Sequence, residues 1–377
     1  MLGASVAVSL AIAEAGLRIA GFSYFNLYTM DPNLGWAPSP KSEGWWTREG
    51  LAYVRINSRG LRDYEHAIEK PRDTIRIAIL GDSFSEAPQV SLENTYWSVM
   101  QRRLQTKLAP RNVEVLNFGV SGFSNARELI MLRQRVWQYS PDVVVLQFTP
   151  SNDISDNSRV LSGDADALPY FVYQDGSLVL DDSLLKNREH KLTYRIQNSF
   201  VGSALNWLRN HLRIVGLVYA VRESFISPAR KGTNAGGKPS LDDSVYRRPA
   251  NSDWAQAWLV TEKLVVQIRN EVQARGARFI IMTATKGIQV DPDVAARAEF
   301  MRKLGVSTLS YPEDRLQELC DREQIDMLNL APPFTEFAQR NQIYLHGFGK
   351  TRGTGHWNES GHKLAGELLA DRLLQKL

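Results

Sequence analysis

Residues 75–80 read IRIAIL and lead directly into Gly81, Asp82 and Ser83, and this stretch decides the fold. A short apolar run that ends in a glycine is typical of a buried strand entering a loop. Four later runs repeat the pattern, at residues 113–118 (VEVLNF), 142–148 (DVVVLQF), 277–283 (ARFIIMT) and 325–330 (IDMLNL).

Longer amphipathic stretches separate most of these apolar runs, and we expect them to be helices. They lie at residues 95–107, 125–139, 253–274 and 313–322, and a last one at 360–377 closes the chain. Such alternation predicts parallel βαβ units. We therefore expect an α/β fold with a central parallel sheet of about five strands covered by helices.

The composition is that of a globular protein. Of the 377 residues, 43% are hydrophobic and 23% are charged, which excludes whole-chain disorder and a multi-span membrane protein. The 45 Lys and Arg residues are interspersed with 41 Asp and Glu residues, so we expect no nucleic-acid partner. A single cysteine, Cys320, excludes an intrachain disulfide framework and a multi-cysteine zinc site.

Residues 1–22 are predicted to be a signal or membrane-anchor segment. The first 13 residues carry no charge. This is short for a bilayer span of about 20 residues, but it suits the apolar region of a secretory signal. No Lys or Arg precedes it, and a buried N-terminal helix is the alternative. We favour the anchor, which places the protein in the cell envelope, on the extracytoplasmic (periplasmic) side.

Residues 23–70 are predicted to be an irregular lead-in with one short strand (AYVRIN), and residues 71–377 to be the α/β domain. Within that domain the alternation fails at residues 158–251. This insertion contains a hairpin that turns at Asp175-Gly176, an amphipathic helix around residues 200–225, and a loop at 227–240 that we expect to be mobile. An insertion this long is typical of a lid or a recognition element.

Four short blocks beside strand ends carry candidate chemistry. Ser83 follows the first strand, at the sheet edge where open α/β folds bind ligands. Gly122 follows the second (NFGVSGF), Asn152 follows the third (SND), and His356 precedes the last helix (GHWNESGH). Taken singly, each has an ordinary structural explanation as a helix cap, a turn glycine or a surface histidine.

Together the four blocks supply a nucleophile, a general base and convergent hydrogen-bond donors. Ser83 is the candidate nucleophile and His356 the candidate base. The N–H groups of Ser83 and Gly122 and the amide of Asn152 form a candidate oxyanion hole. His356 and His362, with Glu359 between them, could be mistaken for metal ligands. No third strong ligand lies nearby in the sequence, so we expect no metal and no cofactor. Neither a G-x-S-x-G elbow nor a phosphate-binding loop is present.

With these residues in place, the chain resembles the SGNH (GDSL-type) hydrolase family. Ser83, Gly122, Asn152 and His356 match the four residues for which that family is named. The resemblance covers residues 75–148 and the tail from 353 onward, and NSRGLRD followed by RIAILGDSFSEA looks like the family's membrane-anchored bacterial branch. The resemblance implies a flavodoxin-like three-layer α/β/α fold and ester hydrolysis through an acyl-serine.

Two positions depart from the family pattern. Pro150 replaces the glycine before the asparagine block. The family's aspartate, two or three residues before the histidine, is replaced by Gly353 and Thr354. Replacing the aspartate of a trypsin-like triad costs about 10⁴ in kcat. Either a carbonyl or a distant carboxylate orients His356, or a Ser–His dyad operates, or activity has decayed. His362 is a weaker rival for the role of base.

Three functions follow from this site. The first is a serine esterase or acyl hydrolase acting on a lipid, an acylated glycan or a small ester. The second is a polysaccharide O-acyltransferase, in which Trp36, Trp45 and Trp46 stack on sugars, although buried tryptophans are the commoner case. The third is a catalytically degenerate binding module, supported only by the missing aspartate.

Overall fold

The computed structural model describes residues 2–163, 168–189, 192–197, 199–226 and 241–377. Its centre is a five-stranded parallel sheet in the order β11-β10-β7-β5-β6. The strands are β5 (Thr74–Leu80), β6 (Asn112–Asn117), β7 (Val143–Phe148), β10 (Arg278–Thr283) and β11 (Asp326–Asn329). Numbered along the chain this order is 2-1-3-4-5, the flavodoxin-like arrangement. The predicted α/β fold with about five parallel strands is therefore confirmed.

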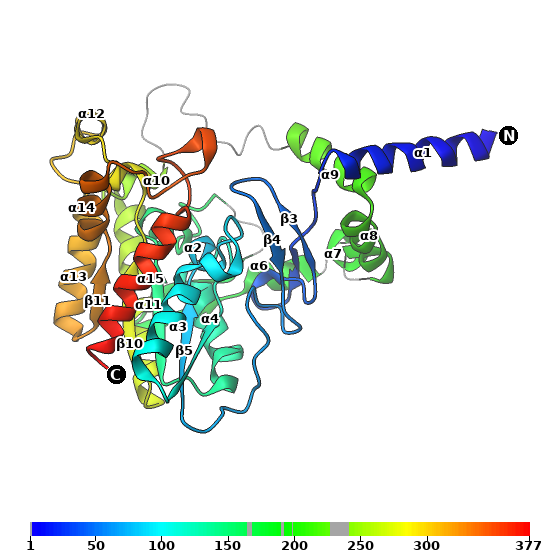
Figure 1. The fold of residues 1–377 in the computed structure, drawn as a ribbon. Helices are drawn as coiled ribbons and strands as arrows, with labels where there is room; N and C mark the ends of the chain where they lie inside the picture. Colours follow the sequence, from blue (N-terminus) through cyan, green and yellow to red (C-terminus); the bar gives the residue numbers. More distant parts are fainter. Residues whose placement is uncertain (1, 164–167, 190–191, 198, 227–240) are drawn as a thin grey trace.

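Helices cover both faces of the sheet, which makes three layers (Figure 1). Side chains alternate along each strand, so that Ile75, Ile77 and Ile79 point to one face while Ala78 and Leu80 point to the other. The first face packs against α3 (Tyr96–Leu108), α14 (Ala331–Asn341) and α15 (Glu359–Leu374). The second packs against α4 (Asn125–Gln134), α11 (Ser252–Ala274) and α13 (Tyr311–Glu323), and Cys320 is buried in this layer.

Short elements connect these layers at both edges of the sheet. They include the four-residue helix α2 (Ser83–Glu86), α5 (Pro150–Asp156) and α12 (Val294–Leu304). Short 3₁₀ turns complete them: η1 (Leu92–Asn94), η2 (Val136–Tyr139), η3 (Gly287–Val290) and η4 (Gly349–Thr351).

The lead-in is more ordered than the sequence indicates. Instead of one short strand it holds two antiparallel hairpins, β1 (Tyr28–Asp31) with β2 (Gly35–Pro38) and β3 (Glu43–Trp46) with β4 (Ala52–Arg55). Each strand has four residues. Phe25, Leu27, Val54 and Ile56 form a small core of their own beneath the second hairpin.

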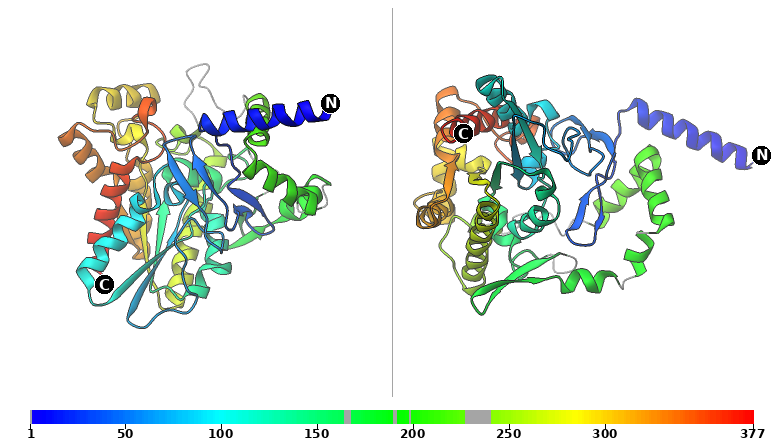
Figure 2. Two further views of the ribbon diagram at one scale, coloured as in Figure 1. Left: turned by 45° about the vertical axis from the view of Figure 1, so that its right-hand side comes forward. Right: turned by 90° about the horizontal axis from the view of Figure 1, so that it is seen from below.

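The insertion extends to one side of the sheet, where Figure 2 shows it as a chain of short elements. The predicted hairpin is present as β8 (Tyr170–Gln174) and β9 (Ser177–Asp181), with Asp175 and Gly176 both at positive φ in the turn. Helices α6 (Ser183–Glu189), α7 (Leu192–Gln197), α8 (Phe200–His211), α9 (Arg213–Ile226) and α10 (Leu241–Ser244) follow. The single helix expected around 200–225 is broken at Leu212, whose backbone is extended. The expected mobile loop 227–240 lies outside the described residues.

The N-terminal helix α1 (Leu2–Ile19) projects away from the sheet (Figure 1). Its contact is with the insertion: both carboxylate oxygens of Glu14 accept hydrogen bonds from the first N–H groups of α9, those of Arg213 and Ile214. Arg18 pairs with Glu14 and donates to the carbonyl of His211. Across the described part of the chain, no helix has the length and apolarity required to span a bilayer.

Candidate active site

Ser83 is the first residue of α2, directly after β5. The preceding Asp82 caps this helix, because its carboxylate accepts a hydrogen bond from Phe84 N–H at 2.9 Å. The cap holds Ser83 at the carboxyl edge of the sheet, with the Ser83 Oγ 2.7 Å from Nε2 of His356. The candidate nucleophile and the candidate base are therefore within hydrogen-bond distance.

A glutamate from the lead-in lies on the other side of the His356 ring. Oε2 of Glu49 lies 2.6 Å from Nδ1 of His356, and Oε1 accepts the backbone N–H of His356 at 2.8 Å. Glu49 sits in the turn between β3 and β4, 307 residues before the histidine. Since an ionised carboxylate only accepts hydrogen bonds, Nδ1 carries the proton and Nε2 is free to accept the Ser83 hydroxyl. Of the options left open by the missing aspartate, the structure shows the distant carboxylate.

Two glycines make room for this glutamate. Gly355 has φ +73°, and a Cβ atom there would lie 2.3 Å from Oε1 of Glu49. In the Glu49 turn, Gly50 has φ +67°, and a Cβ atom would lie 2.3 Å from the carbonyl oxygen of Gln89. Gly355 therefore leaves the space that the Glu49 carboxylate occupies, and Gly50 lets the turn lie against Gln89.

The environment of Glu49 favours its charged form. Burial alone would raise the pKa of this carboxyl, but the hydrogen bonds and the charge of His356 outweigh burial and lower the pKa below its ordinary value. A carboxylate that stays ionised can stabilise the imidazolium that forms when His356 takes a proton.

The predicted oxyanion donors follow neighbouring strands. Ser83 follows β5, Gly122 follows β6 and Asn152 follows β7, and the three strands are adjacent in the sheet. Asn152 Nδ2 donates to Asp82 Oδ2 at 3.0 Å, which leaves the second amide hydrogen for a ligand. Neither Ser83 N–H nor Gly122 N–H donates to another group among the residues that the structure describes. Pro150 starts α5, where a missing N–H costs nothing.

The loop that carries Gly122 is fixed by a buried glutamate of α2. Oε2 of Glu86 accepts hydrogen bonds from Ser121 N–H at 2.7 Å and from the Tyr28 hydroxyl at 2.6 Å. Trp36 donates its ring N–H to the Ser121 carbonyl, and a Cβ atom at Gly122 would lie 3.2 Å from the Trp36 ring. Thus β1 and β2 of the lead-in support the loop of Ser121 and Gly122, which we call the oxyanion loop, while the β3–β4 turn carries Glu49.

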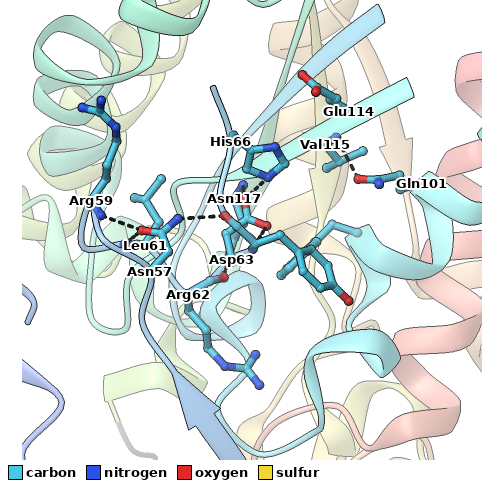
Figure 3. A network of polar contacts seen from close by, with 12 residues as sticks. Asn57, Arg59, Leu61, Arg62, Asp63, His66, Gln101, Glu114, Val115 and Asn117 are labelled. Carbon is cyan, nitrogen blue, oxygen red and sulfur yellow. Dashed lines mark hydrogen bonds and ion pairs between the residues drawn. The ribbon is translucent and has the colours of Figure 1, made fainter. Parts of the chain in front are cut away.

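The NSRGLRD segment, residues 57–63, connects the lead-in to the sheet through hydrogen bonds (Figure 3). Asn57 Oδ1 accepts the N–H groups of Arg59 and Leu61. Asp63 accepts the N–H of Asn117 at the end of β6. The guanidinium of Arg62, fully buried, donates to the carbonyls of Glu86 and Val90.

Asn117 extends this connection to the nucleophile helix. Its amide donates to the carbonyls of Arg62 and Ser85. The segment therefore holds α2, with Ser83 at its start, against the lead-in.

The other histidines near the site are structural. His362 is fully buried, burial lowers its pKa to about 3, and its Nδ1 accepts Tyr96 N–H. His346 is also buried, with its pKa lowered to about 4 and its ring held by Thr285 and the Gly355 carbonyl. His362 is therefore no rival to His356 as base. Over the described ranges there is no group of three metal-ligating side chains.

The structure thus brings Ser83 and His356 into contact and sets Gly122 and Asn152 at the same sheet edge. Sequence reasoning missed Glu49. Its local signal is weak, because Glu43 and Glu65 are equally plausible carboxylates in the same lead-in. The one hint was the glycine directly before His356, which leaves space beside the imidazole.

Comparisons with known proteins add little to this geometry. The chain matches no protein-family model and no curated protein. Similar solved structures include an acetyl xylan esterase with 14% identity and a TM-score of 0.40, covering 79% of this chain and 100% of the other. A lipase/acylhydrolase from Enterococcus faecalis has 13% identity and a TM-score of 0.40, covering 80% and 97%. These neighbours are esterases and acylhydrolases, but likeness at this level carries no argument, and the chemistry has to be derived from the site.

Proposed function

We propose that this protein is a serine esterase or acyl hydrolase that uses a Ser83–His356–Glu49 triad. The single observation that carries the proposal is the unbroken hydrogen-bonded relay from Ser83 Oγ through His356 to Glu49, with distances of 2.7 and 2.6 Å. The SGNH-like residues around it, Gly122 and Asn152, support the same chemistry from independent parts of the chain.

The reaction follows from these positions. His356 Nε2 takes the proton of Ser83 as its oxygen attacks the acyl carbon, and Glu49 stabilises the resulting imidazolium. The N–H groups of Ser83 and Gly122 and the Asn152 amide stabilise the tetrahedral oxyanion, each donor contributing about 3 kcal/mol. His356 then protonates the departing alcohol. The acyl-serine is hydrolysed by a water molecule that His356 activates in the same way, and no cofactor takes part.

The lead-in supplies an argument for a second candidate, transfer of the acyl group to a sugar hydroxyl. The aromatic rings of Trp45 and Tyr53 are 46% and 42% exposed and meet edge to face. Together with Leu51 they line a cavity of about 970 Å³ on the hairpin that carries Glu49. Exposed aromatic faces suit a glycan acceptor. Trp36 and Trp46 are half-buried and contribute less.

We propose further that the protein works in the cell envelope, attached to a membrane by α1. The first 13 residues are uncharged, and Val6, Val8, Leu10 and Ile12 are each more than half exposed. Such exposed apolar surface supports contact with lipid. In flotation with phospholipid vesicles, the full chain should rise with the lipid and a chain of residues 23–377 should remain below. Equal flotation of the two chains would refute this role for α1.

A fluorophosphonate tests the triad directly. The full chain should gain a single adduct in its intact mass, Ser83→Ala should gain none, and His356→Ala should react far more slowly. No adduct on a folded full chain would refute the hydrolase proposal. Adding sugar acceptors to the acylated enzyme then separates the two candidates, because transfer produces an acylated sugar and hydrolysis produces the free acid.

A further inference from the structure

Two arginines from distant parts of the chain meet over one aromatic ring near the active site. The guanidinium carbon of Arg48 lies 4.7 Å from the centroid of the Tyr24 ring, and that of Arg209 lies 5.4 Å from the same centroid. Arg48 comes from the β3–β4 turn, next to Glu49, and Arg209 comes from α8 of the insertion. The pair therefore joins the turn that bears the triad acid to the inserted segment.

Neither arginine has an anionic partner within the described residues. Other arginines of the chain are neutralised in ion pairs, for example Arg103 with Asp371 and Arg315 with Glu262. By contrast, the guanidinium groups of Arg48 and Arg209 lie over aromatic rings, and Nε of Arg209 is buried without a hydrogen-bond partner among the described residues. Partial burial and then the charge of Arg48 lower the pKa of Arg209.

A cavity of about 470 Å³ lies beside Arg209, between the lead-in and α8, and Arg48 stands outside its lining. Among the described residues that line it, Arg209 is the one charged side chain, and the others are apolar or neutral polar groups. A cavity whose charge is a single unneutralised guanidinium favours an anion, because a charge-assisted hydrogen bond replaces the water that burial removes.

The same cavity is lined by two side chains that also support the loop of Ser121 and Gly122. Tyr28 and Trp36 both line it. Tyr28 donates to the glutamate that fixes Ser121, and the Trp36 ring lies against Gly122. A group held in the cavity therefore contacts side chains that support the loop of the proposed oxyanion hole.

We propose that Arg209 binds an anionic group, a carboxylate or a phosphate, carried by the ester substrate, and that Arg48, over the same Tyr24 ring, adds a second positive charge. This inference rests on the proposed hydrolase function and adds a substrate class to it. Guanidinium groups suit both anions because their planar N–H donors match two oxygens of a carboxylate or a phosphate. The insertion would then act in recognition, with α8 supplying one of the two cations.

Matched esters test the proposal on the full chain. One set carries the charge on the alcohol: phenyl acetate, 3-carboxyphenyl acetate and 3-acetoxyphenyl phosphate. A second carries it on the acyl group: phenyl propionate and phenyl hemisuccinate. The readout is the ratio of kcat/KM for each anionic ester to that for its neutral match. With at least one anionic ester, this ratio should fall about tenfold or more in Arg48→Gln and in Arg209→Gln.

Arg275→Gln is the matched control. Arg275 also stacks on an aromatic ring, 4.6 Å from the Trp137 centroid. It lies just before β10, at the amino ends of the strands, whereas the candidate site lies at their carboxyl ends. Its loss removes the same charge and the same kind of contact, and it should leave the ratio unchanged. An equal fall in all three variants would attribute the effect to net charge and overturn the proposal.

Calorimetry on Ser83→Ala gives a readout that does not depend on turnover and tells the two anions apart. Glucuronate and glycerol 3-phosphate serve as probes, with glycerol as the neutral control. Binding of one probe that is lost in Ser83→Ala/Arg209→Gln supports the proposal and identifies the anion. Unchanged ratios in both ester sets, on a chain that reacts with fluorophosphonate, would overturn it and leave the hydrolase function standing. A chain that does not react at all would overturn the hydrolase function itself.

Discussion

Glu49 occupies the position at which a triad enzyme keeps its acid. Its two oxygens bind Nδ1 and the backbone N–H of His356, so it fixes both the orientation of the ring and the position of its proton. A carbonyl oxygen could have done the second task but could not have stabilised the imidazolium by charge. The triad geometry therefore removes the argument for a degenerate binding module, which rested on the absent aspartate.

Glu49→Gln should lower kcat by a factor of about 10² to 10⁴ on a small ester, since an amide can present its N–H₂ to Nδ1 and favour the wrong tautomer. Initial rates with purified protein measure this. Glu43→Gln is the control, because Glu43 is an exposed carboxylate on the same hairpin that pairs with Arg55. Equal rates for Glu49→Gln and Glu43→Gln would show that His356 works without the carboxylate.

Glu313 gives a prediction about stability that is independent of catalysis. Burial raises its pKa from 4.5 to about 7, and its Oε1 accepts a hydrogen bond from Gln289. The folded state therefore holds this proton more tightly than the unfolded state does. The stabilisation is fully present below about pH 4.5 and is lost as the pH rises through about 7.

Glu313→Gln keeps the accepting oxygen but cannot ionise, so the Tm of the variant should exceed that of the parent by a gap that widens between pH 5 and pH 8. Thermal unfolding at a series of pH values measures the gap. Glu318→Gln, an exposed position on the same helix, should show no such trend. A gap for Glu313→Gln that stays constant across this range would contradict the prediction.

At the scale of elements, the contact between Glu49 and His356 joins the β3–β4 turn to the loop before α15. The turn reaches the imidazole because Gly355 presents no side chain toward Glu49. This packing of the turn on Gly355, more than any property of β3 or β4 themselves, holds Glu49 beside the His356 ring.

Gly355→Ala should therefore reduce kcat by tenfold or more, since its Cβ would occupy the place of the Glu49 carboxylate. Gly276→Ala controls for backbone strain: its φ of +75° is nearly the same as the +73° of Gly355, but a Cβ there meets nothing within 4 Å. Gly276→Ala should lose about 1 kcal/mol of stability from its positive φ alone, and Gly355→Ala should lose at least as much. If they lost the same fraction of activity, strain and not displacement of Glu49 would be responsible.

The contact between α1 and α9 explains why charges interrupt the apolar N-terminal segment. Glu14 serves as an external cap for α9, whose first N–H groups would otherwise lack acceptors. In Glu14→Ala, the amides of Arg213 and Ile214 should exchange with deuterium at least several-fold faster, while those inside α11 keep their rates. Unchanged exchange at both amides would mean that the cap contributes no local stability.

The sequence was informative about some elements and not about others for identifiable reasons. The five strands of the sheet were located to within one or two residues, because strands buried on both faces read as continuous apolar runs. The four lead-in strands were missed apart from β4, because each has only four residues and several of them face solvent.

The site shows the same division. Ser83, Gly122, Asn152 and His356 were recognisable because each lies in a short block next to a strand end or helix start. Glu49 has no such block, and its role depends on a contact with a residue 307 positions away. Only the packing of the lead-in on the domain reveals it.

At the scale of the whole molecule, the lead-in is part of the candidate site. It carries Glu49 in the β3–β4 turn, supports the loop of Ser121 and Gly122 through Tyr28 and Trp36, and is joined to β6 and α2 by the NSRGLRD segment. A division of the chain at residue 70 separates Glu49 from the histidine it orients.

The positions of Glu49, Ser83 and His356 along the chain also set the order in which the ribosome synthesises them. Glu49 and Ser83 are synthesised first, and His356 follows 273 residues after the serine. A nascent chain that ends between the two therefore exposes a serine with no base beside it, which is chemically as inert as any other. Under the proposed function, ester cleavage begins only when the segment before α15 has docked and brought His356 to Ser83, so the order of synthesis protects the surrounding acyl groups until that point.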